Sequence, residues 1–250
     1  AGRGLYYPAQ RLYASYWKPS IQGDITLSKT SSSLEISSNN ASYSLEGAVY
    51  GIYSDSACTK EVARITTDAS GHAKSDKLDA GTYWIKEIEP STGFALDLEV
   101  HKADIAAGKT TNVSVSEEPQ VHPIALLLTK VDADLHEAIP QGNASLEGAR
   151  FLVRLFGNTA GDTSGNPLRT WIFASDAQGR VVMDEEHLVS GDGFFTDASG
   201  AIVLPLGTLS LKEISAPQTY YLEGQTSSSG GLSEAPAHTL VFSSNGTSAT

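Results

Sequence analysis

The chain repeats one strand-like phrase at two distant places. Residues 78–90 read LDAGTYWIKEIEP, and residues 204–217 read LPLGTLSLKEISAP. The glycine precedes the glutamate by the same six positions in both copies, because 87 − 81 and 213 − 207 are equal. A repeat of this kind indicates two copies of one structural unit, which restricts the folds that the chain can adopt.

Three further landmarks occur twice in the same order. They are a lysine that ends an alternating strand (Lys29, Lys130), the tetrapeptide LEGA (45–48, 146–149) and the pentapeptide TDASG (67–71, 196–200). The lysine precedes LEGA by 16 residues in both copies (45 − 29 and 146 − 130). The second copy then holds 28 additional residues before TDASG, since (196 − 146) − (67 − 45) is 28. We therefore expect one scaffold used twice, with an inserted excursion near 157–195 in the second copy.

The local pattern is typical of β-structure throughout. Short alternating or β-branched runs such as ITLSK, TYWIKEI and HTLVFSS are separated by clusters of Asp, Ser, Asn and Gly, which form turns. The sequence predicts an all-β chain of two tandem, immunoglobulin-like β-sandwiches. We expect them over 22–121 and 122–250, with a boundary at PQVHP (119–123), where two prolines interrupt strand pairing. Residues 1–21 match neither copy and are predicted to be a leader segment or a docked strand.

Composition excludes several classes of partner and chemistry. The net charge is −12, with no basic run, so nucleic acid and anionic membrane surfaces are poor partners. No apolar stretch is long enough to insert into a membrane.

The six histidines are scattered and the single cysteine, Cys58, has no evident catalytic partner, so we expect no metal and no cofactor. Sequence motifs of hydrolases, phosphate-binding loops and zinc proteases are missing, and the chain is not expected to be an enzyme. It begins without methionine or a leader, so we expect a processed or excised form.

The ordered landmarks resemble those of the SpaA or Cna B-type, prealbumin-like domains of Gram-positive cell-surface adhesins and pilins. The matching segments are LEGAVYGIY and LEGARFLV, the two TDASG turns, and the phrases LDAGTYWIKEIEPSTGF and LPLGTLSLKEISAPQTYYL. In that family, a buried lysine amine attacks the side-chain carbonyl of an asparagine or aspartate, and a glutamate transfers the proton. The resemblance implies this isopeptide chemistry for Lys29 with Glu87, and for Lys130 with Glu213.

The acceptor residues differ from the family pattern. Alternation along VSVSEEP puts Glu117 where the family has asparagine, and turns Asn112 to the other face. In the second copy Asn245 follows Phe242 by three residues instead of two, a difference that a β-bulge would repair. The resemblance therefore favours a bond from Lys130 to Asn245 over one from Lys29 to Glu117. A plainer interpretation stays open, in which both lysines are strand-end residues with solvated amines and the glutamates pair with neighbouring lysines.

These observations predict a structural stalk or pilin-like module of an extracellular, cell wall-associated adhesin. Its expected partners are other surface or pilus subunits and a host extracellular protein or glycan. An alternative is a ligand-recognition module whose contacts come from aromatic residues of the excursion, namely Trp171, Phe173, Phe194 and Phe195. A third class, an accessory β-domain of a secreted enzyme, requires a catalytic domain elsewhere in the parent protein.

Overall fold

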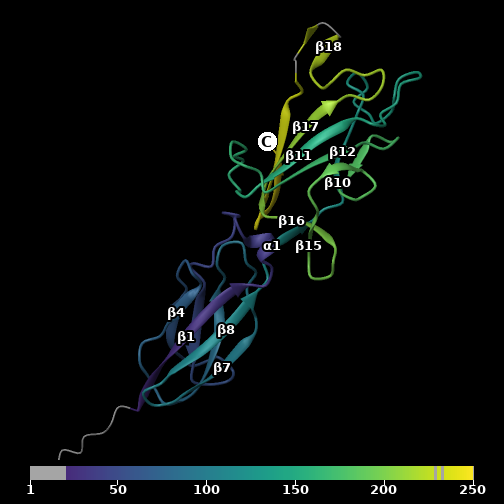
Figure 1. Ribbon diagram of the computed structural model, residues 1–250. Helices are drawn as coiled ribbons and strands as arrows, with labels where there is room; N and C mark the ends of the chain where they lie inside the picture. The colour runs from purple at the N-terminus through teal and green to yellow at the C-terminus, as the bar shows by residue number, and fades with distance from the viewer. Residues whose placement is uncertain (1–20, 228–229, 232–233, 250) are drawn as a thin grey trace, which may run out of the picture.

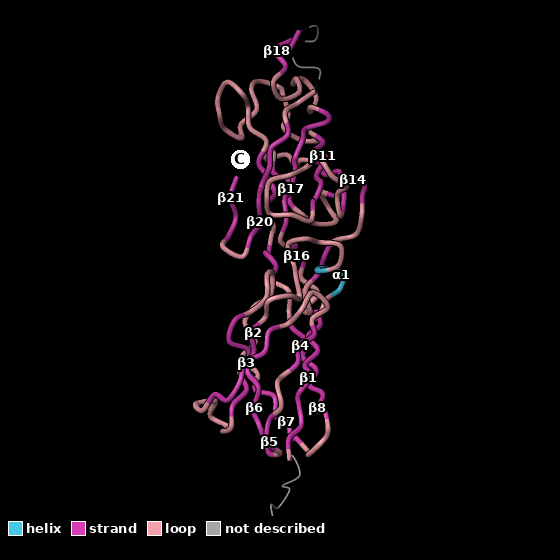
Figure 2. Tube along the Cα trace, turned by 90° about the vertical axis from the view of Figure 1, so that its left-hand side faces the viewer, coloured by secondary structure: helices cyan, strands magenta, loops and turns pink. Residues whose placement is uncertain are grey.

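The computed structural model describes residues 21–227, 230–231 and 234–249, and these residues confirm the all-β class. The single helix in the described part of the chain is the four-residue α1 (Leu34–Ser37). Two β-rich units follow each other along an elongated molecule (Figure 1). We refer to residues 22–119 as the first unit and to residues 121–249 as the second unit. α1 lies where the two units meet, as Figure 2 also shows.

The first unit places two four-stranded sheets face to face. In one sheet, β1 (Gln22–Ser31) pairs with β4 (His72–Lys74), β5 (Leu78–Asp79) and β8 (Thr110–Glu117). The other sheet has the order β3 (Glu61–Thr66), β2 (Val49–Tyr53), β6 (Gly81–Glu89) and β7 (Val100–Ile105). Alternate side chains such as Ile25, Leu27 and Ile85 fill the space between the sheets, as expected for a sandwich buried on one face of each sheet.

The second unit is built around a six-stranded sheet. Its order is β14 (Leu188–Gly191), β12 (Arg169–Ala174), β11 (Arg150–Phe156), β17 (Gly207–Ser215), β20 (Ala237–Ser243) and β21 (Gly246–Ala249). Smaller sheets complete it: β10 (Leu126–Thr129) with β13 (Arg180–Val182), β15 (Phe195–Thr196) with β16 (Ile202–Pro205) and β9 (Val121–Pro123), and β18 (Gln225–Ser227) with β19 (Gly230–Gly231).

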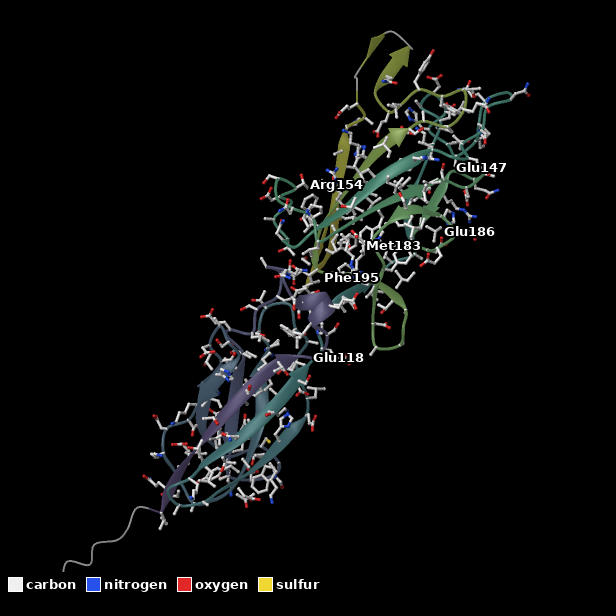
Figure 3. All side chains as sticks on the ribbon, viewed as in Figure 1. Glu118, Glu147, Arg154, Met183, Glu186 and Phe195 are labelled. Carbon is white, nitrogen blue, oxygen red and sulfur yellow. The ribbon has the colours of Figure 1, made fainter. Side chains whose placement is uncertain are left out.

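The aromatic side chains of the excursion lie in the core of the second unit. Trp171, Phe173 and Phe195 are buried, and Phe194 packs on the first two with ring centroids 6.4 and 6.1 Å apart. Trp171 and Phe173 face inward because they are alternate residues of β12 and share the face that packs on the core. In Figure 3, Phe195 and Met183 lie among the strands whereas Glu186 projects from the surface. Trp171, Phe173 and Phe195 are therefore covered by the core and not exposed to a ligand, contrary to the expectation, whereas Phe194 is half-buried.

The turn that matches the first TDASG is not the second TDASG. In the first unit, the amide of Lys29 donates to the carbonyl of Gly71, the last residue of TDASG, at 2.8 Å. In the second unit the amide of Lys130 donates to Gly179, the last residue of SDAQG (175–179), at 2.6 Å. The second TDASG instead connects β15 to β16. The second TDASG is therefore not the structural counterpart of the first, although the two sequences are identical. Seven of the additional residues precede SDAQG, since (175 − 146) − (67 − 45) is 7, and the others follow β13.

A segment of the first unit packs into the core of the second. Ile36, Tyr43 and Phe94 belong to the same hydrophobic cluster as the strands of the second unit. The amide group of the Asn40 side chain donates to the carbonyl of Leu206 at 2.9 Å, and the amide of Ala41 donates to the carbonyl of Gly157 at 2.9 Å. Buried apolar contact combined with directed hydrogen bonds holds the two units in one relative arrangement.

Candidate cross-linking site

Lys29 is a charged residue type buried near the end of β1. It follows Ile25 and Leu27 on the inward face of β1, because alternate residues of a strand share a face. Its side chain is fully buried. Burial of a lysine is rare unless the amine has partners, so the contacts of the Lys29 amine define the site.

Two glutamates from two other strands surround the amine of Lys29. Its Nζ donates to Oε1 of Glu87 on β6 at 3.1 Å and also to Oε2 of Glu117 on β8. The two carboxyl groups are as inaccessible as the lysine, with side-chain exposures of 0% and 1%. Residues separated by up to 88 positions in the chain thus meet at one buried point.

Further groups of the first unit orient these carboxyls. The hydroxyl of Tyr50 donates to Oε1 of Glu117, and the backbone amide of Asp97 donates to Oε2 of Glu87 at 2.7 Å. The ring of Phe94 covers the amine, with Nζ 5.0 Å from the ring centroid. The amine is therefore held between two carboxyl groups and an aromatic face, without access to bulk water.

Burial shifts the pKa of two groups in this cluster, Glu87 and Tyr50. It raises the pKa of Glu87, because the charged carboxylate loses hydration, although the Asp97 amide and Lys29 oppose the shift. Burial and the hydrogen bond to Glu117 raise the pKa of the Tyr50 hydroxyl, which therefore stays a donor at neutral pH. One amine faces two carboxyls, so a proton retained on a carboxyl avoids an excess negative charge in the core.

The arrangement provides the groups for amide formation. A neutral amine is a nucleophile, a protonated carboxylic acid is an electrophile, and a second carboxyl with a raised pKa can transfer protons between them. Tyr50 donates to the oxygen of Glu117 that would gain negative charge during attack, which is the role of an oxyanion-binding group.

The second unit contains a more open version of the same pair. The Lys130 amine lies 3.0 Å from Glu213 Oε1, and the amide of Glu223 donates to Glu213 Oε2 at 2.8 Å, as Asp97 does for Glu87. The Lys130 side chain is 13% exposed, unlike that of Lys29. Phe151 is paired with Glu213 where Tyr50 is paired with Glu87, so the phenol hydroxyl is missing.

The structure does not bring Asn245 to Lys130, which corrects the pairing favoured from the sequence. Asn245 is exposed in the turn between β20 and β21. That turn lies beyond Phe242, which pairs with Gly207 at the start of β17, whereas Glu213 lies near the other end of β17. Six residues of strand correspond to about 20 Å. A one-residue bulge cannot move Asn245 across that distance.

Sequence reasoning identified Lys29, Glu87 and Glu117, but it missed Tyr50, Phe94 and the amide of Asp97. Tyr50 could have been found by comparing LEGAVY with LEGARF, because the two copies differ there by a hydroxyl group. Phe94 ends the phrase LDAGTYWIKEIEPSTGF that carries the resemblance, and Asp97 follows it in the connection between β6 and β7, where the sequence shows no pattern.

One cluster outside this site has metal-ligating groups. Asp97, Glu99 and His101 place ligand atoms within 4.8 Å of one another. The Glu99 side chain is 73% exposed, and three ligands of mixed exposure on a surface segment do not define a metal centre. The described residues include no helix of the length and apolarity that a membrane crossing needs.

Comparison with known proteins agrees with this geometry. Residues 23–119 match the family model of SpaA, described as a prealbumin-like fold domain. The first unit therefore matches a SpaA-type prealbumin-like domain, which confirms the resemblance for this part of the chain. No curated protein matches the sequence.

Two solved structures are similar to the chain at low sequence identity. The chain is similar to the Bacillus anthracis TIE protein, with a TM-score of 0.53 and 22% identity over 86% of this chain and 32% of that one. It therefore spans about a third of the length of that protein. A C-terminal fragment of the pilus adhesin SpaC from Lactobacillus rhamnosus GG matches with a TM-score of 0.48 and 13% identity, over 91% of this chain and 85% of that fragment.

Proposed function

We propose that this chain is a load-bearing structural module of an extracellular, cell wall-associated adhesin or pilus of a Gram-positive bacterium, made of two tandem prealbumin-like β-sandwiches. The SpaA family match over 23–119 supports this function. The observation that carries it further is the contact of the buried Lys29 amine with both Glu87 and Glu117. In this proposal Lys29 and Glu117 form an intramolecular amide bond, and Glu87 transfers the proton.

The reaction is a condensation that releases water. The neutral Lys29 Nζ attacks Cδ of the protonated Glu117 carboxyl, and Tyr50 stabilises the oxygen that becomes negative. Glu87 accepts a proton from the nitrogen and returns it to the departing hydroxyl group. The new bond is Nζ–Cδ, the broken bond is a Cδ–O bond of Glu117, and one water leaves. The site catalyses one event and turns over no external substrate.

The bond joins the first and last strands of the first unit. It closes a loop of 88 residue steps, because 117 − 29 is 88. The chain-entropy relation used for disulfides gives about 4 to 5 kcal/mol of stabilisation for a loop of this length. Tension applied at the two ends of the unit then passes through a covalent bond between β1 and β8.

Intact mass under denaturing conditions tests the bond. We expect the wild-type chain to weigh one water less than its sequence, and Lys29→Ala and Glu87→Gln to have their full sequence masses. Glu117→Gln supplies the sharpest comparison, because its amide releases ammonia and yields the same cross-linked product as the wild type. The matched control is Lys86→Ala, which removes the neighbouring lysine that lies on the other face of β6 and keeps the deficit.

A wild-type mass equal to the full sequence would overturn the cross-link. In that case Lys29, Glu87 and Glu117 form a buried ion pair with a shared proton, and the structural role rests on the fold alone. A deficit that persists in Lys29→Ala would place the bond elsewhere and equally contradict the assignment.

A further inference from the structure

The connection between β1 and β2, residues 32–48, joins the candidate cross-linking site to the second unit. It begins directly after β1, which carries Lys29 near its end. It includes α1, which lies where the two units meet (Figure 2), and it places Ile36 and Tyr43 in the hydrophobic cluster of the second unit. The position of the second unit therefore acts on a segment that is continuous with the lysine-bearing strand.

A series of contacts leads from the second unit to the Lys29 amine. The backbone amide of Leu206 donates to the hydroxyl of Tyr43 at 2.8 Å. The ring of Tyr43 meets the ring of Phe94 edge-on, with ring centroids 5.9 Å apart. Phe94 in turn covers the amine, with Nζ 5.0 Å from its ring centroid. The side chains of Tyr43 and Phe94 therefore connect the backbone of the second unit to the nitrogen that reacts.

The same two side chains also contact the segment that follows Glu117. Phe94 forms an antiparallel bridge with Pro119, two residues beyond Glu117. The hydroxyl of Tyr43 donates to the carbonyl of Gln120 at 2.6 Å. Tyr43 therefore fixes the aromatic cover and the end of the acceptor strand together, and its other hydrogen bond includes the second unit in this arrangement.

A surface cavity shows where water would reach the amine if this arrangement relaxed. Its volume is about 390 Å³, and its lining includes Lys29, Tyr43 and Phe94 together with Leu34 and Ser37 of the connection. Serine side chains make up much of the remaining lining, so the cavity is polar enough to hold water. Phe94 both lines this cavity and covers the amine. The position of its ring therefore decides whether water reaches the site.

Exclusion of water matters for this reaction because water is its product. Water reverses the condensation of an amine with a carboxylic acid, and hydration favours the charged, unreactive forms of both groups. Burial raises the pKa of Glu87, which makes its carboxylate a better proton acceptor, and hydration would cancel that effect. A covered amine is therefore a condition for the bond between Lys29 and Glu117.

We propose that docking of the second unit, acting through Tyr43, holds Phe94 over the Lys29 amine, and that the cross-link forms only in this docked arrangement. Tyr43 and Phe94 are then positioning residues, because they place the reacting groups and exchange no protons with them. The bond forms after the second unit has folded against the first, so the chain is locked only once its units are docked. This inference rests on the cross-link proposed above.

Time-resolved mass spectrometry of the newly made full chain tests the coupling. The chain is synthesised in a cell-free system, aliquots are quenched in denaturant, and the fraction that lacks one water is measured. The test variant is Gly157→Val in the second unit, because a Cβ at Gly157 would lie 3.0 Å from Cα of Asn40 and push the connection away. We expect its deficit to appear at least about tenfold more slowly than that of the wild type, since small displacements of reacting groups have such effects.

Three controls separate docking from loss of the fold. Gly165→Val changes a glycine of the same excursion where nothing lies within 4 Å of an added Cβ, and it should keep the wild-type rate. Melting curves in the Lys29→Met background, which cannot cross-link, show whether Gly157→Val is folded. Phe94→Ala should slow the reaction, and Phe94→Leu, which restores an apolar cover, should recover most of the rate. If Gly157→Val is unfolded, Tyr43→Phe replaces it, because it keeps the ring and removes the hydrogen bond to the second unit.

The outcomes distinguish this coupling from the cross-link itself. Equal rates in the wild type and in folded Gly157→Val would overturn the coupling and leave the cross-link intact. An unchanged rate in Phe94→Ala would contradict the coupling as well, because the ring would then not act on the amine. A wild-type chain that never loses water would overturn the cross-link, and the coupling with it.

Discussion

The hydroxyl group of Tyr43 accepts a hydrogen bond from the backbone amide of Leu206 at 2.8 Å, across a sequence distance of 163 residues. The same hydroxyl donates to the carbonyl of Gln120 at 2.6 Å. Burial raises the pKa of Tyr43 to about 12, so it remains a donor at physiological pH. One side chain thus connects the first unit, the segment between the units and the second unit.

Tyr43→Phe should weaken this connection without creating a cavity. The substitution leaves a buried amide at Leu206 and a carbonyl at Gln120 without their partner, which costs about 1 to 3 kcal/mol in unfolding free energy. Urea denaturation at pH 7 measures the loss. The control is Tyr83→Phe, whose hydroxyl donates to Asp79 at an exposed position and should change stability by less than about 0.5 kcal/mol. Equal effects of the two substitutions would contradict the bridging role of Tyr43.

The free energy of unfolding should decrease as pH rises above 4.5, the ordinary pKa of a glutamate, because of Glu87. Burial raises the pKa of Glu87 in the folded state, so the folded protein holds a proton there that the unfolded chain has released. This contribution is fully present below pH 4.5 and is lost as pH rises through the folded value. The measurement is the melting temperature between pH 4 and pH 8 in the Lys29→Met background, which cannot cross-link. Adding Glu87→Gln should flatten the decrease, and an unchanged slope would show that Glu87 is not the titrating group.

Gly179→Ala should destabilise the second unit more than Gly161→Ala. Both glycines have positive φ, 75° and 77°, so both substitutions pay about 1 to 2 kcal/mol for a left-handed backbone. A Cβ at Gly179 would also lie 2.4 Å from the carbonyl oxygen of Lys130, whereas nothing lies within 4 Å at Gly161. Thermal unfolding should show a further loss of about 1 to 3 kcal/mol for Gly179→Ala. Equal losses would mean that the turn does not contact β10.

Asn245→Ala should leave the intact mass deficit of the chain unchanged. Asn245 lies in an exposed hairpin turn far from Lys130, so it cannot be the source of a leaving group. Mass spectrometry of this variant beside the wild type, corrected for the substitution itself, measures the result. Loss of the deficit in this variant would restore the bond from Lys130 to Asn245 and contradict the structure.

The alternation of apolar residues accounts for what could be predicted from the sequence. Period-two patterns in ITLSK and VSVSE fix which side chains face inward, and this places Lys29 and Glu117 in one core once β1 and β8 pair. The same rule turns Asn112 outward, where the hydroxyl of Thr26 donates to it.

In the second unit, an identical turn sequence was a poorer guide to the structure than the alternation of apolar residues. Two TDASG turns have the same local hydrogen bonds, with Gly71 bonded to Asp68 and Gly200 bonded to Asp197, yet only the first adjoins the lysine-bearing strand. A turn motif specifies local backbone geometry and not its neighbours. Burial of Trp171, Phe173 and Phe195 was missed for a similar reason, because it depends on packing against strands that are distant in the sequence, such as β10 with Leu127 and β17 with Leu209.

The parallel pairing of β1 with β8 determines how the first unit meets a pull along the molecule. The chain enters at the start of β1 and leaves at the end of β8, and the two strands run side by side in the same direction. Opposite forces at those points slide one strand along the other, so the hydrogen bonds of all eight paired positions are strained together in shear. An antiparallel hairpin pulled at its open end would instead lose its hydrogen bonds one after another. The first unit therefore resists extension through all of these paired positions at once, even before any covalent bond forms.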